Sequence, residues 1–189
     1  MIIAGIDPGT IVTGIGILDD SRKQPLLVFS GTIRLSGKES IAARLETIFT
    51  ELRALFREWK PEVVALEGVF YQKDFKAAAK VGEARAAAML AARTNRIPVV
   101  EYPPARVKSS VCGNGRASKN QVQYMVRHVL QLTGTLTPDS ADAIAIALCH
   151  SQMKKFAQIH KEYGTGSGRD RFLSEGSKPN LPRNRTGTV

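Results

Sequence analysis

The chain has 189 residues, 43% of them hydrophobic, which fits one globular domain with a proper core. Lys and Arg number 27 against 17 Asp and Glu, so the formal net charge is +10. This charge favours a polyanionic partner, nucleic acid ahead of an anionic membrane, although a surface biased for solubility is the simpler alternative. No apolar run approaches the roughly 20 residues that span a bilayer, and no signal-peptide pattern opens the sequence, so neither is expected.

The chain has two cysteines, Cys112 and Cys149. Their positions match neither a metal-ligand spacing nor a disulfide-rich framework. A reducing, cytoplasmic setting is therefore expected.

The first part of the chain predicts a meander followed by a helix and a buried strand. Three segments rich in Ile and Val are predicted strands: residues 2–7, 12–18 and 26–35. The loops between them are short, so we expect antiparallel pairing. Apolar residues recur with a helical period over 39–59, and Pro61 ends that helix. Residues 62–67 predict a short buried strand parallel to the first.

The second part continues the alternation of helices and strands. The predicted elements are a helix over 74–94, a strand over 97–101, a flexible loop at Gly113–Gly115, a helix from the N-cap Ser118 to about Leu132, and a last helix from Pro138 to Ile159. Helices that alternate with buried strands indicate an α/β fold. Large apolar residues become scarce after about residue 160, so we expect one folded domain over 1–160 and a disordered, basic tail with Gly and Pro over 161–189.

Four carboxylates stand in distinctive positions. Asp7 ends the first strand and Glu67 ends the strand predicted to be parallel to it. Asp139 and Asp142, three residues apart, share one face of the last helix, with Cβ atoms roughly 5–6 Å apart. That pair has a simpler explanation, because acids in a first turn stabilise the helix dipole. Whether all four acids converge is left open by the sequence.

Convergence of these acids would call for cations. Two like charges 4 Å apart repel by about 4 kcal/mol at an effective dielectric near 20. Mg²⁺ prefers oxygen ligands, and two ions roughly 3.5–4 Å apart can clamp the attacking and leaving oxygens of a phosphodiester. The acids in this basic chain therefore suggest metal-dependent phosphodiester hydrolysis.

Basic and aromatic residues near the acids are candidates for nucleic-acid contacts. Aromatics interleaved with lysines suit base stacking beside phosphates, and a flexible basic loop can close on a backbone phosphate. The candidates are Phe70, Tyr71, Lys73, Lys76, Lys108, Arg116 and Lys119. Ordinary surface charge is the alternative for each lysine. The three histidines show no ligand spacing, and we expect them on helix surfaces or in the tail.

Several motifs, in order along the chain, carry a family resemblance. They are Gly5-Ile6-Asp7-Pro8-Gly9-Thr10, Thr13-Gly14, Glu67-Gly68-Val69-Phe70 and Asp139-Ser140-Ala141-Asp142-Ala143. Together they resemble the RuvC family of Holliday-junction resolvases over about residues 1–155. Gly68 stands where many members of that family have Gln, which leaves the preferred cleavage sequence open.

The resemblance implies an RNase H-like α/β fold, with a five-stranded mixed sheet flanked by helices on both faces. It implies a homodimer that makes paired symmetric nicks in four-way junction DNA, leaving 5′-phosphate and 3′-hydroxyl ends. It also implies partnership with a branch-migration complex of RuvA and RuvB. Asp7, Glu67, Asp139 and Asp142 match the family's catalytic, metal-binding acids, which take two Mg²⁺ ions for which Mn²⁺ can substitute. Lys108, Lys119 and Phe70 match its DNA contacts.

Three other functions compete with this interpretation. The opening strand, followed by Asp7-Pro8-Gly9-Thr10, also resembles the start of ATP-dependent enzymes of the actin and sugar-kinase type. Such enzymes need two domains of this kind, and 189 residues are too few for both. A non-catalytic junction-binding protein would not need all four acids. A related nuclease that acts on RNA would share them.

Overall fold

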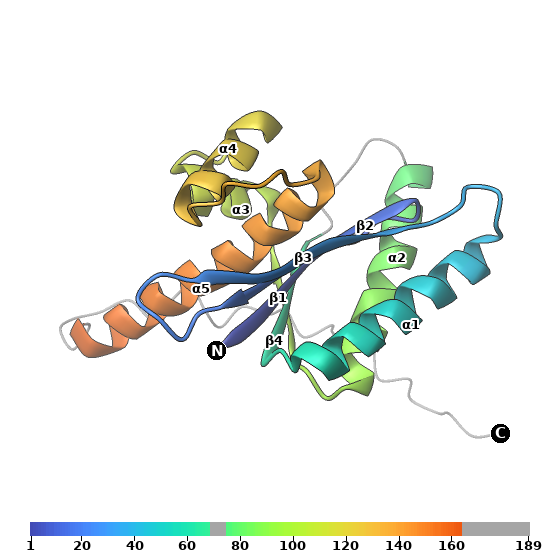
Figure 1. Cartoon of the computed structure of the whole chain (residues 1–189), viewed down its shortest axis with the longest axis horizontal. Helices are drawn as coiled ribbons and strands as arrows, with labels where there is room; N and C mark the ends of the chain where they lie inside the picture. Colours follow the sequence, from blue (N-terminus) through green and yellow to red (C-terminus); the bar gives the residue numbers. More distant parts are fainter. Residues whose placement is uncertain (69–74, 164–189) are drawn as a thin grey trace, which may run out of the picture.

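A computed structural model of the chain describes residues 1–68 and 75–163, and it contains one mixed sheet with helices on both faces (Figure 1). The strands are β1 Ile2–Asp7, β2 Val12–Asp19, β3 Leu26–Arg34, β4 Val63–Glu67 and β5 Val99–Tyr102. The helices are α1 Ile41–Trp59, α2 Phe75–Thr94, α3 Pro104–Cys112, α4 Lys119–Val129 and α5 Pro138–Tyr163. The predicted five-stranded α/β architecture is confirmed.

The strand order across the sheet is β3-β2-β1-β4-β5. β1 pairs antiparallel with β2, and β2 with β3, which confirms the predicted meander. β4 pairs parallel with β1, and β5 parallel with β4. β1 and β4 therefore end at the same edge of the sheet, which is where Asp7 and Glu67 stand.

Alternating side chains of the strands build two cores, one on each face of the sheet. Ile6 and Leu66 belong to the core beneath α1 and α2. Ile3 and Ala65 belong to the core shared with α3, α4 and α5. Figure 1 shows α1 and α2 on one side of the strands and α3, α4 and α5 on the other. A strand's successive residues face opposite sides, so Asp7 lies on the same face as Ile3, toward α5.

Helix α5 packs unusually close to β1 and β2 because three glycines face it. A Cβ atom on Gly5 would collide with the backbone of Ala143, and one on Gly14 would collide with the backbone of Asp139. A Cβ on Gly16 would lie 2.5 Å from Cγ1 of Ile144 and 2.9 Å from its Cα. The absence of side chains at these positions lets the helix backbone rest directly on the sheet.

Several boundaries differ from those predicted. Helix α3 was missed because it is short, begins with Pro104 and buries only Val107 and Val111, so its apolar period is brief. The helix capped by Ser118 ends at Val129 rather than Leu132, because Gln131 adopts a left-handed φ of 52°. Helix α5 continues to Tyr163, beyond the predicted end at Ile159. Residues 164–189 of the predicted tail lie outside the described residues.

Among the residues that the structure describes, no helix is both long enough and apolar enough to cross a membrane.

The glycine contacts predict opposite effects for two Gly→Ala changes. Gly16→Ala forces a methyl group into Ile144 and should lower the free energy of unfolding by roughly 1–3 kcal/mol, the usual cost of overpacking. Gly82→Ala is the matched control, because a Cβ in this part of α2 meets nothing within 4 Å. It should raise stability by about 0.5–1 kcal/mol through helix propensity. Urea unfolding measures both, and a Gly16→Ala protein as stable as the parent would contradict the close packing of α5.

Candidate active site

Two of the four acids lie side by side at one edge of the sheet. Asp7 is the last residue of β1, and its partner across the antiparallel ladder is Gly14. Glu67 follows Leu66, the residue of β4 that pairs with Ile6, so it stands level with Asp7 on the adjacent strand. Like Asp7, Glu67 lies on the face of the sheet that carries α5. The strand register alone therefore brings these two carboxylates together.

The other two acids arrive from α5. Asp139 and Asp142 occupy the first turns of this helix, whose start is tied by the Thr137 hydroxyl, which accepts from the Ser140 N–H at 3.3 Å. The backbone of Asp139 rests against Gly14, directly opposite Asp7 in the sheet. The glycine-lined contact thus places the acidic end of α5 over the acidic edge of the sheet.

The charges of the other three acids all act on Asp7. Burial, followed by the negative charges of Asp142, Glu67 and Asp139, raises the pKa of Asp7 to about 7, while Lys119 opposes this rise. Burial and then Asp142 also raise the pKa of Glu67. A carboxyl group with its pKa at about 7 is poised between its neutral and charged forms at neutral pH, so an added cation would favour the charged form.

Two lysines partly offset this negative charge. The Lys119 ammonium lies 2.8 Å from a carboxylate oxygen of Asp142, and this ion pair is the first cause of the raised pKa of Lys119. Lys119 opens α4, where Ser118 and Gln121 form a capping box that fixes the start of the helix. Lys108, from α3, acts with Lys119 to oppose the rise in the pKa of Glu67. Both lysines predicted from the sequence therefore face the acid cluster.

The structure does not place the other predicted DNA-contact residues against the acid cluster. Arg116 is exposed in the loop before α4 and is not among the charges that act on Asp7 or Glu67. Phe70, Tyr71 and Lys73 lie outside the described residues, and Lys76 is described only as part of α2. Their predicted DNA contacts stay predictions.

The turn after Asp7 is held by groups that the motif contained but whose role the sequence did not reveal. The buried Thr13 hydroxyl donates to the Gly9 carbonyl at 2.9 Å and accepts from the Gly9 N–H at 3.2 Å. The Arg44 guanidinium, from α1, donates to the Thr10 carbonyl at 2.9 Å. These bonds fix the backbone beyond Asp7 and so limit the movement of its carboxylate.

A second support, behind Glu67, was missed entirely. The Gly68 N–H donates to the Tyr102 carbonyl at 2.8 Å, and the Tyr102 hydroxyl lies 2.7 Å from Nδ1 of His150. His150 is thus a half-buried partner of β5 rather than the surface histidine expected from its spacing. A Cβ on Gly68 would lie 3.6 Å from the Tyr102 carbonyl oxygen, so there is room at this position for a side chain.

The donor set fits a divalent cation by its chemistry. Carboxylate oxygens are the ligands that Mg²⁺ and similar hard ions prefer, and the raised pKa of Asp7 indicates negative charge that is not fully neutralised. Within 1–68 and 75–163, however, no three His, Cys, Asp or Glu side chains form a ready coordination shell. The ammonium of Lys119 already neutralises one of the acids, Asp142.

The pKa of Asp7 predicts an unusual pH dependence. Because its pKa is higher in the folded protein than the ordinary 3.8, the folded state binds the proton more tightly, and the free energy of unfolding falls as pH rises from about 4 to about 7. Asp7→Asn should flatten this slope and be more stable than the parent at pH 8 in a metal chelator. Urea unfolding across pH 4–8 provides the measurement.

The control for this prediction is Asp19, at the opposite end of the sheet. The Ser21 backbone N–H lowers its pKa, so Asp19→Asn should instead lose stability above pH 4. An Asp7→Asn protein with the parent's pH slope would contradict the electrostatic coupling of the acids.

Comparisons with known proteins agree with the resemblance to the RuvC family. The family model for crossover junction endodeoxyribonuclease RuvC matches residues 3–150. RuvC from Halorhodospira halophila is 49% identical over 149 residues, which cover 79% of this chain and 89% of the relative. RuvC from Pseudoalteromonas atlantica is 45% identical over 150 residues, covering 79% and 86%.

Solved structures give the same result and confirm the RNase H-like fold. The structure of Thermus thermophilus RuvC has a TM-score of 0.76 at 34% identity and covers 83% of this chain and 97% of its own. T. thermophilus RuvC in complex with a Holliday-junction substrate has a TM-score of 0.78 at 33% identity, covering 83% and 96%. The matched residues 3–150 of the family model contain all four acids. The chain therefore belongs to the RuvC family of crossover junction endodeoxyribonucleases.

Proposed function

We propose that Asp7, Glu67, Asp139 and Asp142 form the catalytic centre of a Holliday-junction resolvase that requires a divalent metal. The observation that carries this proposal is the raised pKa of Asp7, to which the other three acids contribute. Carboxylates held this close are costly to maintain in a folded protein, and function is the common reason for such clusters. Membership of the RuvC family supplies the substrate, four-way junction DNA.

The four acids would divide the work by their positions. Asp7 and Glu67 are fixed by adjacent strands, so their separation is set by the sheet. Asp142 raises the pKa of both of them and would therefore sit across from the pair. This arrangement suits oxygen ligands that hold cations between the sheet and α5. Bound Mg²⁺, or Mn²⁺ in its place, would supply Lewis-acid stabilisation of the negative charge that develops at the scissile phosphate.

The protein's own residues orient the substrate and the acids. Lys108 and Lys119 face the carboxylates from α3 and α4 and would attract the DNA backbone toward them. The Lys119 ammonium is held by Asp142, and it would exchange that partner for phosphate when DNA and metal arrive. We propose two metal ions for each site and hydrolysis to 5′-phosphate and 3′-hydroxyl ends.

Resolution of a junction requires nicks on two strands. A homodimer with one acid cluster in each subunit would supply both nicks, and RuvA and RuvB are the partners proposed for branch migration. These assembly proposals rest on family membership. Size-exclusion chromatography with light scattering tests the dimer.

Replacement of an acid should abolish nicking without abolishing DNA binding. Asp142→Asn removes one charge and one strong oxygen ligand, and we expect the cleavage rate on a labelled four-way junction in Mg²⁺ to fall by roughly 10²–10³-fold or more. The matched control is Asp19→Asn, the same change at the opposite end of the sheet, which should cleave at the parent rate. Gel assays of labelled junctions measure the rate and the symmetry of the nicks.

Three results would contradict the proposed function. They are Asp142→Asn cleaving as fast as the parent, linear duplex being nicked as readily as the junction, and tight junction binding without nicks in either Mg²⁺ or Mn²⁺. An RNA–DNA hybrid in the same assay separates a junction resolvase from a related nuclease that acts on RNA.

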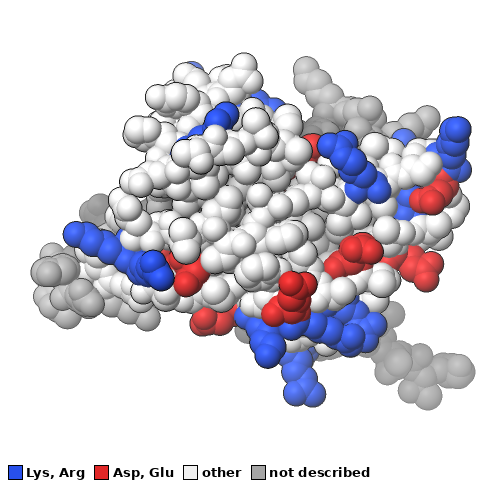
Figure 2. Space-filling view, in the orientation of Figure 1, with Lys and Arg blue, Asp and Glu red and all other residues white. Residues whose placement is uncertain are grey.

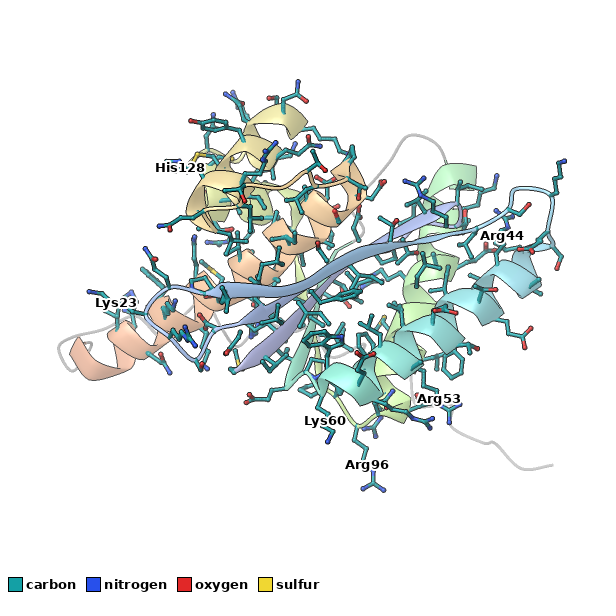
Figure 3. The ribbon with its side chains drawn as sticks, in the orientation of Figure 1. Lys23, Arg44, Arg53, Lys60, Arg96 and His128 are labelled. Carbon is teal, nitrogen blue, oxygen red and sulfur yellow. The ribbon has the colours of Figure 1, made fainter. Side chains whose placement is uncertain are left out.

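The two lysines should contribute to the salt dependence of junction binding. Each phosphate contact releases counterions, so Lys108→Gln or Lys119→Gln should reduce the slope of log affinity against log salt by about 1. Lys60→Gln is the control, because the exposed Lys60 caps the end of α1 on the other side of the sheet from α3 and α4 (Figure 3). Fluorescence anisotropy between roughly 50 and 200 mM salt measures the slopes. Equal slopes for all three variants and the parent would exclude phosphate contacts by these lysines.

A further inference from the structure

A hollow on the described surface lies along α4 and reaches the start of α5. Its volume is about 820 Å³, in the range of sites that hold small molecules or single nucleotides. Asn120, at one end of its lining, directly follows Lys119, and Ala141, also in the lining, directly precedes Asp142. Lys119 and Asp142 are the ion pair of the active site. The hollow therefore lies along the same two helices, α4 and α5, that carry this ion pair.

The segment that builds this surface has an acid-free, basic sequence. Between Tyr102 and Pro138 there are five Lys or Arg residues and no Asp or Glu. In Figure 2 the surface over α3 and α4 shows Lys and Arg atoms among uncharged ones and no Asp or Glu atoms. Arg127 from this segment lines the hollow and is exposed. An anionic chain could continue from the active site into the hollow without meeting a carboxylate.

Two aromatic rings stand exposed on the same helix. Tyr124 and His128, one turn apart on α4, are stacked with centroids 6.1 Å apart and an angle of 8° between their planes. Tyr124 is 67% exposed, and Figure 3 places His128 on the outer side of α4. Val122 and Val126 already supply the buried face of this helix. The core therefore does not require the aromatic pair.

Tyr124 also separates two hollows. It lines the 820 Å³ hollow and a second one of about 480 Å³ on the side of Asn114, and Asn120 lines both. A flat ring that projects between two hollows, with side-chain amides and a guanidinium nearby, matches the chemistry of single-strand recognition. Bases stack on the ring, while amides and cations contact base edges and phosphates.

We infer that the outer face of α4 is a nucleotide-binding subsite, in which Tyr124 stacks on a base of the strand that leaves the scissile phosphate. This subsite rests on the proposed function and adds to it a place where unpaired or distorted bases of the junction are held. Arg127 contacts the backbone of the same strand, and Asn120 and Gln123 lie beside the base.

The positions of the two rings along α4 determine which bases of the strand they could contact. Tyr124 and His128 lie five and nine residues beyond Lys119. At a rise of 1.5 Å per residue they stand about 7.5 and 13.5 Å from Lys119 along the axis. Successive nucleotides of a stacked strand rise about 3.4 Å, so the aromatic pair reaches bases about two to four positions from the scissile phosphate, on one side only.

A fluorescent base analogue tests this subsite without catalysis. The scissile position is first mapped with the parent protein, and 2-aminopurine is then placed three nucleotides to either side of it in separate junctions. Binding is followed in a metal chelator, so no strand is cut. The parent should alter the fluorescence on one side only. Tyr124→Ala should lose that signal and bind the junction roughly tenfold more weakly, the loss of one base stack.

Two further variants distinguish stacking from a general loss of structure. Tyr124→Phe keeps the ring and should restore both the signal and the affinity. Phe156→Ala removes the ring of a similar exposed aromatic–histidine pair in α5, Phe156 with His160, and should behave as the parent. Parent-like signal and affinity in Tyr124→Ala would overturn the subsite. Failure of every protein, including Phe156→Ala, to bind the junction would instead show that the proposed function itself is wrong.

Discussion

The direct contact between α5 and the glycines of β1 and β2 is the constraint on which the site depends. Gly14 lies opposite Asp7 in the sheet and against the backbone of Asp139 in the helix, so one residue links both halves of the acid cluster. A larger side chain there would lift the helix and separate the carboxylates. The same contact covers one face of the sheet and builds one of its two cores. The packing of α5 and the proposed catalytic site therefore share a single interface in this protein.

That interface brings like charges together, and the surrounding structure compensates for only part of the repulsion. Lys119 pairs with Asp142, and Lys108 acts on Glu67, yet the pKa of Asp7 still stands near 7. A folded protein that holds such a group is less stable at neutral pH than it would be with an amide in its place. A divalent cation would relieve the repulsion, so metal binding and stability should be coupled.

Much of the sheet and the acid positions could be predicted from the sequence because each depends on local patterns. Alternating apolar strands, short loops and a buried strand after Pro61 predict the meander and the parallel strand, and hence the shared edge of Asp7 and Glu67. The sequence could not establish that α5 brings Asp142 to that edge, because this depends on long-range packing against Gly5, Gly14 and Gly16. The Tyr102–His150 contact joins residues far apart in the chain, and the short helix α3 lacks a sustained apolar period, so neither left a local signal.

In the proposed function, the sheet edge and the start of α5 together form one cation site. A crystal structure of the full chain soaked in Mn²⁺, with the ions located by their anomalous scattering, tests this most directly. We expect ions bound jointly by Asp7 and by at least one acid from β4 or α5, with the Lys119 ammonium displaced from Asp142. Mn²⁺ bound only elsewhere, or an Asp7 carboxylate without an ion at saturating Mn²⁺, would contradict it.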